Sequence, residues 1–177
     1  MTTVLVACVG NIFKGDDGFG VEVAVDLAGR DLPDEVRVVD FGIRSVHLVY
    51  ELLAGYDVLV LVDTVAQQEG PPGSVYLIEP DVPPASYDED PLPAVMLDAH
   101  DLSPGGVMAL VPTLGGQVDR ILVVGVQPLT LEDGIGLSEP VRAAVGPAAD
   151  LVVETVEREL RRLRQVTAAT SRTREVE

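Results

Sequence analysis

Cysteine, tryptophan and basic residues are scarce in this chain, and each shortage excludes a class of protein. Of 177 residues only Cys8 is a cysteine, so the chain holds no internal disulfide, which is typical of a reducing compartment and predicts a cytoplasmic location. There is no tryptophan and aromatic residues make up 4%, which argues against stacking on nucleic-acid bases. The formal net charge of −17 would repel nucleic acids and anionic membranes.

Long hydrophobic runs are also missing. No apolar run approaches the ~18 residues that a membrane span needs, and no basic region followed by an apolar stretch suggests a signal peptide. Yet 47% of the residues are hydrophobic, which is enough for the core of one domain. We therefore expect a single α/β domain over residues 1–164. Cys8 lies in an apolar run, where a buried structural thiol is more common than a nucleophile.

The apolar residues that are present predict alternating strands and helices. Short, fully apolar runs are typical of strands buried on both faces of a parallel sheet, and runs with a period of 3.6 residues are typical of helices. This order predicts a three-layer α/β fold with a mostly parallel twisted sheet and helices on both faces. The expected strands are 4–9, 36–39, 58–62, 75–78 (nearer an edge) and 121–126, and the expected helices start near residues 21, 45, 101 and 138.

Two other segments are predicted to form loops. Residues 80–95 are rich in proline and acidic residues and predict an exposed loop, and residues 129–137 predict a second loop. Pro140, at the first turn of the last helix, favours a helix start there. The highly charged end predicts a disordered tail over residues 165–177.

The loop after the first strand carries two adjacent carboxylates, Asp16 and Asp17. Gly10 and Gly15 have the spacing of a phosphate-binding loop, but Asp16 and Asp17 stand where that loop needs Lys and Ser or Thr. Two negative charges would repel a phosphate from the following helix. Ile12 likewise breaks the dinucleotide-binding pattern of glycines. Two interpretations remain: the pair binds a metal or another cation, or it only caps the helix.

Acidic residues follow three of the expected strands. Asp17 lies just past the first strand, Asp40 ends the second and Asp63 ends the third. The carboxyl ends of parallel strands meet at one edge of the sheet, where open α/β sheets bind ligands. Clustered carboxylates raise one another's pKa, and a cation would relieve that repulsion. The alternative is chance, because strands often end in aspartate for turn formation.

The chain has two histidines, and each is a candidate for the third ligand of a metal site. His100 precedes a predicted helix in a polar loop and is the better candidate, whereas His47 lies on a predicted helix and is more often a surface or packing residue. Two carboxylates and one imidazole form a ligand set suited to nickel, zinc or manganese, with coordination positions left open. The chain contains neither the H-E-x-x-H motif of zinc proteases nor the G-x-S-x-G motif of serine hydrolases.

At this point the sequence resembles the hydrogenase maturation endopeptidases over roughly residues 4–163. The most specific part is the segment 10–20, GNIFKGDDGFG, which is similar to the opening G-N-x-x-x-x-D-[DE]-x-x-G signature of the family. Five further segments follow in the family's order: Asp40-Phe41-Gly42, Leu61-Val62-Asp63, Ala99-His100-Asp101-Leu102-Ser103, Val124-Gly125-Val126-Gln127-Pro128 and Gly136-Leu137-Ser138.

The resemblance implies a function. Members of this family remove a C-terminal extension from the large-subunit precursor of a nickel–iron hydrogenase after nickel insertion. Position by position, the implied metal-binding and catalytic residues are Asp17, Asp63 and His100, and Asp40 and Gly42 are implied in substrate binding. The implied metal is nickel supplied by the substrate, and no organic cofactor is expected. Nickel would polarise the scissile carbonyl for attack by water.

Two departures from the family pattern concern the substrate. Phe41 replaces the first glycine of the family's D-G-G segment, and Arg44 stands where small or hydroxyl residues are common. Both positions lie where a substrate tail is expected to pass. The proline-rich segment 80–95 is a further expected difference within the family.

Three functions remain open from the sequence alone. The first is the metal-dependent maturation endopeptidase, which acts on a hydrogenase large-subunit precursor and uses neither nucleic acid nor membrane insertion. The second is a non-catalytic nickel-sensing or chaperone module for the same precursor. The third is a nucleotide-binding α/β domain, which the acidic first loop disfavours.

Overall fold

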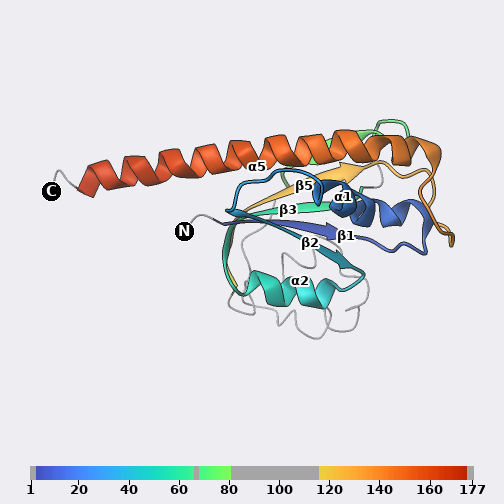
Figure 1. Ribbon diagram of the computed structural model, residues 1–177, viewed down its shortest axis with the longest axis horizontal. Coiled ribbons are helices and arrows are strands. Elements are labelled where there is room, and N and C mark those ends of the chain that lie inside the picture. Colours follow the sequence, from blue (N-terminus) through green and yellow to red (C-terminus); the bar gives the residue numbers. More distant parts are fainter. Residues whose placement is uncertain (1–2, 66–67, 81–115, 175–177) are drawn as a thin grey trace.

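The computed structural model describes residues 3–65, 68–80 and 116–174. In these ranges a single sheet is covered by helices (Figure 1). The strands are β1 (Val4–Val9), β2 (Val36–Gly42), β3 (Tyr56–Thr64), β4 (Val75–Ile78) and β5 (Val118–Val126), and the helices are the 3₁₀-helix η1 (Gly15–Gly18), α1 (Phe19–Leu27), α2 (Ser45–Leu52) and α5 (Glu139–Arg174).

The sheet has the strand order β2-β1-β3-β5-β4. The strands β2, β1, β3 and β5 run parallel, and β4 pairs antiparallel with β5 at the edge. The four parallel strands therefore end at one common edge of the sheet, called the carboxyl edge below. The expectation of a mostly parallel sheet is confirmed, and β4 is an edge strand as predicted.

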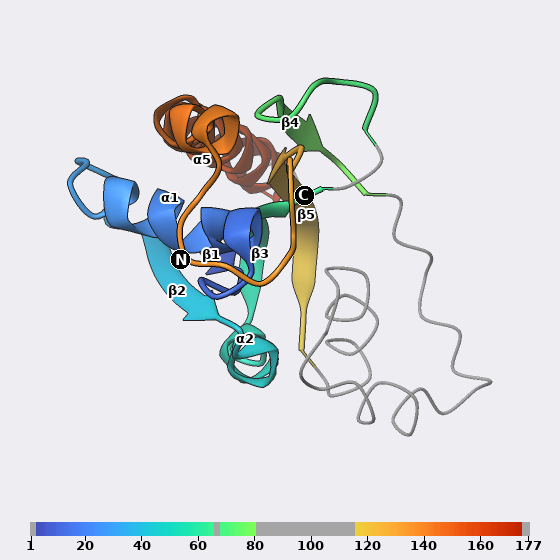
Figure 2. The same ribbon diagram turned by 90° about the vertical axis from the view of Figure 1, so that its right-hand side faces the viewer.

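Two hydrophobic clusters fill the space on the two faces of the sheet. One cluster joins the sheet to α1 and α5, and the other joins it to α2. Figures 1 and 2 show the same arrangement, with α1 and α5 on one face and α2 on the other. The predicted three-layer α/β fold is thus confirmed.

The apolar strand sequences follow from this two-sided burial. In β1, Val4 and Val6 belong to the cluster under α1 and α5, whereas Leu5 and Ala7 belong to the cluster under α2. Successive side chains of a strand point to opposite faces, so a strand buried on both sides must be apolar at every position. The lone thiol of Cys8 is fully buried, as expected for a structural cysteine.

Several element ends differ from the sequence prediction. Strand β2 continues past Asp40 to Gly42, because β1 goes on pairing with it through Val9 and Gly42. Ser45, expected at the cap, is the first residue of α2, and Arg44 occupies the cap position without a side-chain hydrogen bond. The first helical turn begins earlier than residue 21, with η1 leading directly into α1.

Helix α5 is long and runs the length of the sheet and beyond it (Figure 1). It begins at Glu139, with Pro140 in its first turn as predicted. Where the sequence predicted a disordered tail, the backbone is helical as far as Arg174. Among the described residues, no helix has both the length and the apolar composition that a membrane span requires.

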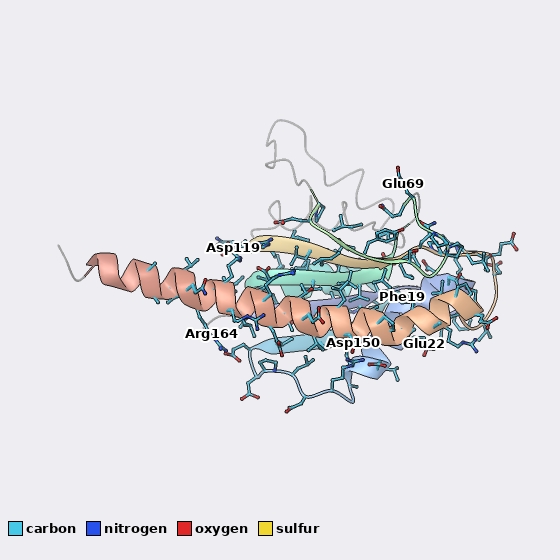
Figure 3. All side chains as sticks on the ribbon, turned by 90° about the horizontal axis from the view of Figure 1, so that it is seen from above. Phe19, Glu22, Glu69, Asp119, Asp150 and Arg164 are labelled. Carbon is cyan, nitrogen blue, oxygen red and sulfur yellow. The ribbon has the colours of Figure 1, made fainter. Side chains whose placement is uncertain are left out.

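Glu159 ties this helix to the sheet. Its side chain is almost fully buried, and its carboxylate lies 2.8 Å from Nε of Arg162 and 3.6 Å from Nε of Arg120 on β5. A buried carboxylate needs such partners, since an unpaired charge in the interior is strongly destabilising. Arg164, farther along α5, pairs with Glu35 and is labelled in Figure 3.

Two predicted features lie outside the described residues. They are the proline-rich loop at 80–95 and the helix expected after Asp101 or Ser103, which belongs to the same segment as His100.

Candidate functional site

Close backbone packing places the first loop over the carboxyl edge. A Cβ atom on Gly20 would collide with the carbonyl oxygen of Val9 and lie 2.7 Å from that of Val62, at the ends of β1 and β3. Only glycine permits this approach without a shift of the backbone. The glycine that closes the loop motif therefore brings the start of α1, and with it Asp17, against the end of β3.

Gly10 and Asn11 fix the position of Asp17. Gly10 has φ of +147°, and a Cβ there would collide with the carbonyl oxygen of Asp17. The backbone N–H of Asn11 donates a hydrogen bond of 2.9 Å to Oδ2 of Asp17. Among the hydrogen bonds of the described residues, none reaches Oδ1 of Asp17. The Asp17 carboxylate is thus held through Oδ2.

Asp63 lies near the end of β3 and within electrostatic reach of Asp17. Burial raises the pKa of the Asp63 carboxyl to about 7, and the negative charge of Asp17 adds to the shift. The N–H of Thr64 donates a 2.6 Å hydrogen bond to Oδ1 of Asp63, which opposes the shift without cancelling it. Two neighbouring carboxylates at the carboxyl edge are the arrangement that the sequence predicted for Asp17 and Asp63. A cation would stabilise their doubly ionised form.

The Asp16 carboxylate binds a different part of the chain, the loop before α5. Its side chain is fully buried and accepts hydrogen bonds from the N–H groups of Leu129, Thr130 and Ser138 and from the Ser138 hydroxyl, at 2.7–3.1 Å. Burial by itself would raise the pKa of Asp16, but these hydrogen bonds outweigh it and lower the pKa. Neither η1 nor α1 has a side-chain cap, so the interpretation of Asp16 and Asp17 as helix caps is wrong.

Asp40 and Gly42, the residues predicted to bind substrate, lie at the end of β2. Oδ1 of Asp40 accepts a 2.8 Å hydrogen bond from the N–H of Gly42, and the N–H of Gly10 donates to the Gly42 carbonyl at 3.0 Å. Gly42 has φ of +52°, a conformation that glycine adopts readily. Together with the burial of the thiol, the charge of Asp40 raises the pKa of Cys8 to about 12. The exposed Asp40 thus stands beside the first loop on the outer side of β1.

The two departures from the family pattern differ in what they contact. Phe41 is 4% exposed and packs in the cluster beneath α2, so it is a core residue and does not line a substrate path. Arg44 is exposed, and its guanidinium donates to the backbone carbonyls of Phe41 and Asp40 at 3.2 and 3.1 Å. The cation of Arg44 therefore lies next to the backbone of the predicted substrate-binding segment.

The histidines cannot complete the site from the described residues. His100 lies outside them. His47 is exposed on α2, as expected for a surface residue. Within the ranges that the structure describes, no three His, Cys, Asp or Glu residues are grouped so that they could hold a metal ion. Of the three residues predicted as metal ligands, Asp17 and Asp63 lie in the part of the chain that the structure describes.

Sequence reasoning missed the role of Asp16. Its hydrogen-bond partners lie 113 to 122 positions away along the chain, so no local pattern could identify them. The signal that was available is the position of Ser138 directly before the last helix, which suggested a cap. In the fold Ser138 instead donates to Asp16.

Comparison with known proteins identifies a family that this chain resembles over most of its length. The family model described as "Hydrogenase maturation protease" matches residues 21–155. The chain is 30% identical to the hydrogenase 2 maturation protease of Escherichia coli K12 over 151 residues, covering 85% of this chain and 88% of the relative. It is 33% identical over 153 residues to the hydrogenase expression/formation protein HoxM of Azotobacter vinelandii, covering 85% and 70%.

Solved structures lead to the same family. The crystal structure of a hydrogenase 2 maturation peptidase from a Thaumarchaeota archaeon superposes with a TM-score of 0.65 at 33% identity, covering 88% of this chain and 99% of the other. The maturating endopeptidase HybD of E. coli gives a TM-score of 0.68 at 25% identity, covering 89% and 94%. The chain therefore belongs to the hydrogenase maturation protease family.

Proposed function

We propose that this protein is a metal-assisted endopeptidase of the cytoplasm that removes the C-terminal extension of a nickel–iron hydrogenase large-subunit precursor after nickel insertion. Family membership supports the proteolytic activity and the class of substrate. The observation that carries the metal-assisted mechanism is the proximity of Asp17 and Asp63 at the carboxyl edge, where the charge of Asp17 raises the pKa of Asp63.

The residues fit a divalent cation in charge and ligand type. Asp17 and Asp63 supply carboxylate oxygens, and the resemblance assigns the third ligand to His100. Carboxylates and an imidazole suit nickel. When bound, nickel supplies Lewis-acid polarisation of the scissile carbonyl. In this proposal the nickel arrives with the precursor, so cleavage depends on prior nickel insertion.

The chain's own residues have three tasks in this mechanism. The Asn11 N–H and the Gly10 turn hold the Asp17 carboxylate in place. The Thr64 N–H holds that of Asp63. Asp40 and Gly42, beside the first loop, bind the polypeptide next to the cleaved bond. Water adds its hydroxyl to the acyl carbon, its proton goes to the amine, and the C–N bond breaks.

A cleavage assay with matched variants tests this proposal. The nickel-loaded precursor is incubated with the protein, and intact-mass spectrometry measures the shortened large subunit. We expect Asp17→Asn, Asp63→Asn and His100→Ala to slow cleavage by about 100-fold or more. Asp119→Asn, which alters an exposed carboxylate at the opposite end of the sheet (Figure 3), should cleave like the unsubstituted protein. Nickel-free precursor should remain intact.

Two results would contradict the proposal in different ways. Equal cleavage of nickel-free precursor would remove the metal from the mechanism. Tight binding of nickel-loaded precursor without any shortened product would instead favour the non-catalytic nickel-sensing or chaperone function.

A further inference from the structure

Five large apolar side chains are exposed on two adjoining loops next to the candidate site. Single exposed apolar residues are ordinary, but a contiguous group marks an interaction surface. The exposed fractions range from 43% for Leu131 to 85% for Ile135. We call this group the apolar patch, and it consists of Ile12, Phe13, Leu129, Leu131 and Ile135.

Two loops far apart in sequence form the apolar patch. Ile12 and Phe13 belong to the loop after β1, and the other three belong to the loop between β5 and α5. Lys14 and Gly134 form an isolated parallel β-bridge between the loops. The Gly15 N–H donates to Gly134 at 2.9 Å, and the Gly134 N–H donates to Phe13 at 2.9 Å. Figure 2 shows the two segments running alongside each other.

The apolar patch is held rigidly. Besides the backbone bonds, the buried Asp16 carboxylate binds Leu129 and Thr130 of one loop from within the other. A surface that is ordered before binding loses less conformational entropy in a complex, which favours tight association. Exposed apolar side chains on a rigid backbone are therefore suited to docking a partner.

The position of the apolar patch indicates which partner docks there. Asp17, in η1, follows Ile12 and Phe13 closely along the chain, and its Oδ2 accepts a hydrogen bond from the Asn11 N–H, so a partner docked on the patch lies beside the candidate site. The net charge of −17 works against a second copy of this chain as the occupant. The exposed Glu132 and Asp133 lie between Leu131 and Ile135 in the same loop, and a mixture of apolar and polar side chains is typical of a protein interface.

We propose that the apolar patch is the docking surface for the hydrogenase large-subunit precursor. This inference rests on the proposed function for the identity of the substrate. It adds that recognition occurs through apolar contacts on the first and last loops of the carboxyl edge, outside the carboxylate pair. The patch determines the affinity for the precursor, while Asp17 and Asp63 act on the bond that is cleaved.

Binding measurements with substituted patch residues test the inference. The immobilised probe is the nickel-loaded precursor with its extension, and the protein carries Asp63→Asn so that the precursor is not consumed. We expect Phe13→Ser and Ile135→Ser each to weaken binding by about tenfold or more, and the double variant to weaken it further. Val25→Ser, 67% exposed on α1, and Tyr50→Ser, 67% exposed on α2, are matched controls and should bind like the parent.

The same substitutions are then made without Asp63→Asn. In that background, the precursor concentration at half-maximal cleavage should rise about tenfold, with the rate at saturation retained. Far-UV circular dichroism and thermal melting should show unchanged folding, because the substituted side chains are exposed.

Three results would overturn the inference. One is binding within about twofold of the parent for both patch variants. Another is the absence of any precursor binding by the parent protein. If the unsubstituted enzyme still cleaves the precursor, that result contradicts the docking surface and leaves the proposed function intact. The third is a dimer in sedimentation that dissociates in the double variant, which would assign the patch to a second copy. If the patch variants weaken binding as expected but the unsubstituted enzyme does not cleave the precursor, the proposed function is contradicted and the docking surface is not.

Discussion

At the scale of single residues, the two aspartates Asp16 and Asp63 have opposite surroundings. Asp16 is surrounded by hydrogen-bond donors, which keep its charge stable in the interior. Asp63 is partly buried with a carboxylate neighbour, which disfavours its charge. The buried charge of Asp16 thus joins two loops, whereas the charge of Asp63 at the candidate site has too few stabilising partners.

The raised pKa of Asp63 predicts a pH-dependent stability. The folded state binds this proton more tightly than the unfolded chain, so the contribution is fully present below about pH 4 and is lost as pH rises through about 7. A shift of one pKa unit corresponds to about 1.4 kcal/mol. Because the shift spans about three pKa units, Asp63→Asn should stabilise the metal-free protein at pH 8 by about 4 kcal/mol relative to its effect at pH 4.

Urea unfolding with a chelator at both pH values measures this difference. Comparing variant with wild type cancels the titration of the other carboxyl groups. Asp119→Asn is the control, because Asp119 is exposed and should give the same small effect at both pH values. An equal effect of Asp63→Asn at pH 4 and pH 8 would contradict the raised pKa.

Residues with a local sequence signal could be predicted at the candidate site. Asp17 and Asp63 each follow an apolar run, and the parallel order of those runs implied a common edge. Phe41 could not be placed in this way, because the choice between a core and a substrate path depends on α2 packing above it. The role of Asp16 likewise depends on a loop more than one hundred residues away.

At the scale of elements, the loop between β5 and α5 depends for its conformation on contacts with the segment that follows β1. It has no regular secondary structure of its own apart from the bridge at Gly134. The Asp16 carboxylate satisfies three of its backbone N–H groups, which would otherwise lack partners in a partly buried position. The sequence predicted this loop correctly but could not predict what holds it.

Asp16→Asn tests how strongly the two loops are joined. The amide would present N–H donors to groups that are themselves donors, so we expect a loss of about 3 kcal/mol in the free energy of unfolding. Hydrogen exchange at Leu129, Thr130 and Ser138 should become faster. Asp133→Asn, an exposed carboxylate of the same loop, is the control and should change neither quantity. Unchanged exchange in Asp16→Asn would show that the bridge at Gly134 alone orders the loop.

At the scale of the whole molecule, negative charge exceeds positive charge by a wide margin. With a net charge of −17, the acidic side chains repel one another within the folded domain. Most ion pairs in the described residues are partly exposed, for example Arg37 with Glu51 and Arg161 with Glu157. Such pairs stabilise by less than about 1 kcal/mol each. We therefore expect the general repulsion to outweigh the contribution of these exposed pairs.

Salt should accordingly stabilise this protein. Raising NaCl from about 0.01 M to about 0.1 M shortens the Debye length from ~30 Å to ~10 Å and screens repulsion between distant charges. We expect the melting temperature at pH 7.5 to rise by a few degrees. Differential scanning calorimetry measures the change, with an equally concentrated neutral solute as control. A lower melting temperature in salt would mean that the local ion pairs dominate.

Local patterns in the sequence were enough to predict the succession of strands along the chain, the class of fold and a common edge for Asp17 and Asp63. These follow from short-range periodicity, which the local backbone geometry dictates. Three features became visible in the folded chain alone: Gly20 packs against the strand ends, Asp16 binds a distant loop, and the apolar patch draws on two segments. Those features arise from contacts between residues far apart in sequence, and no periodic pattern within a single segment encodes them.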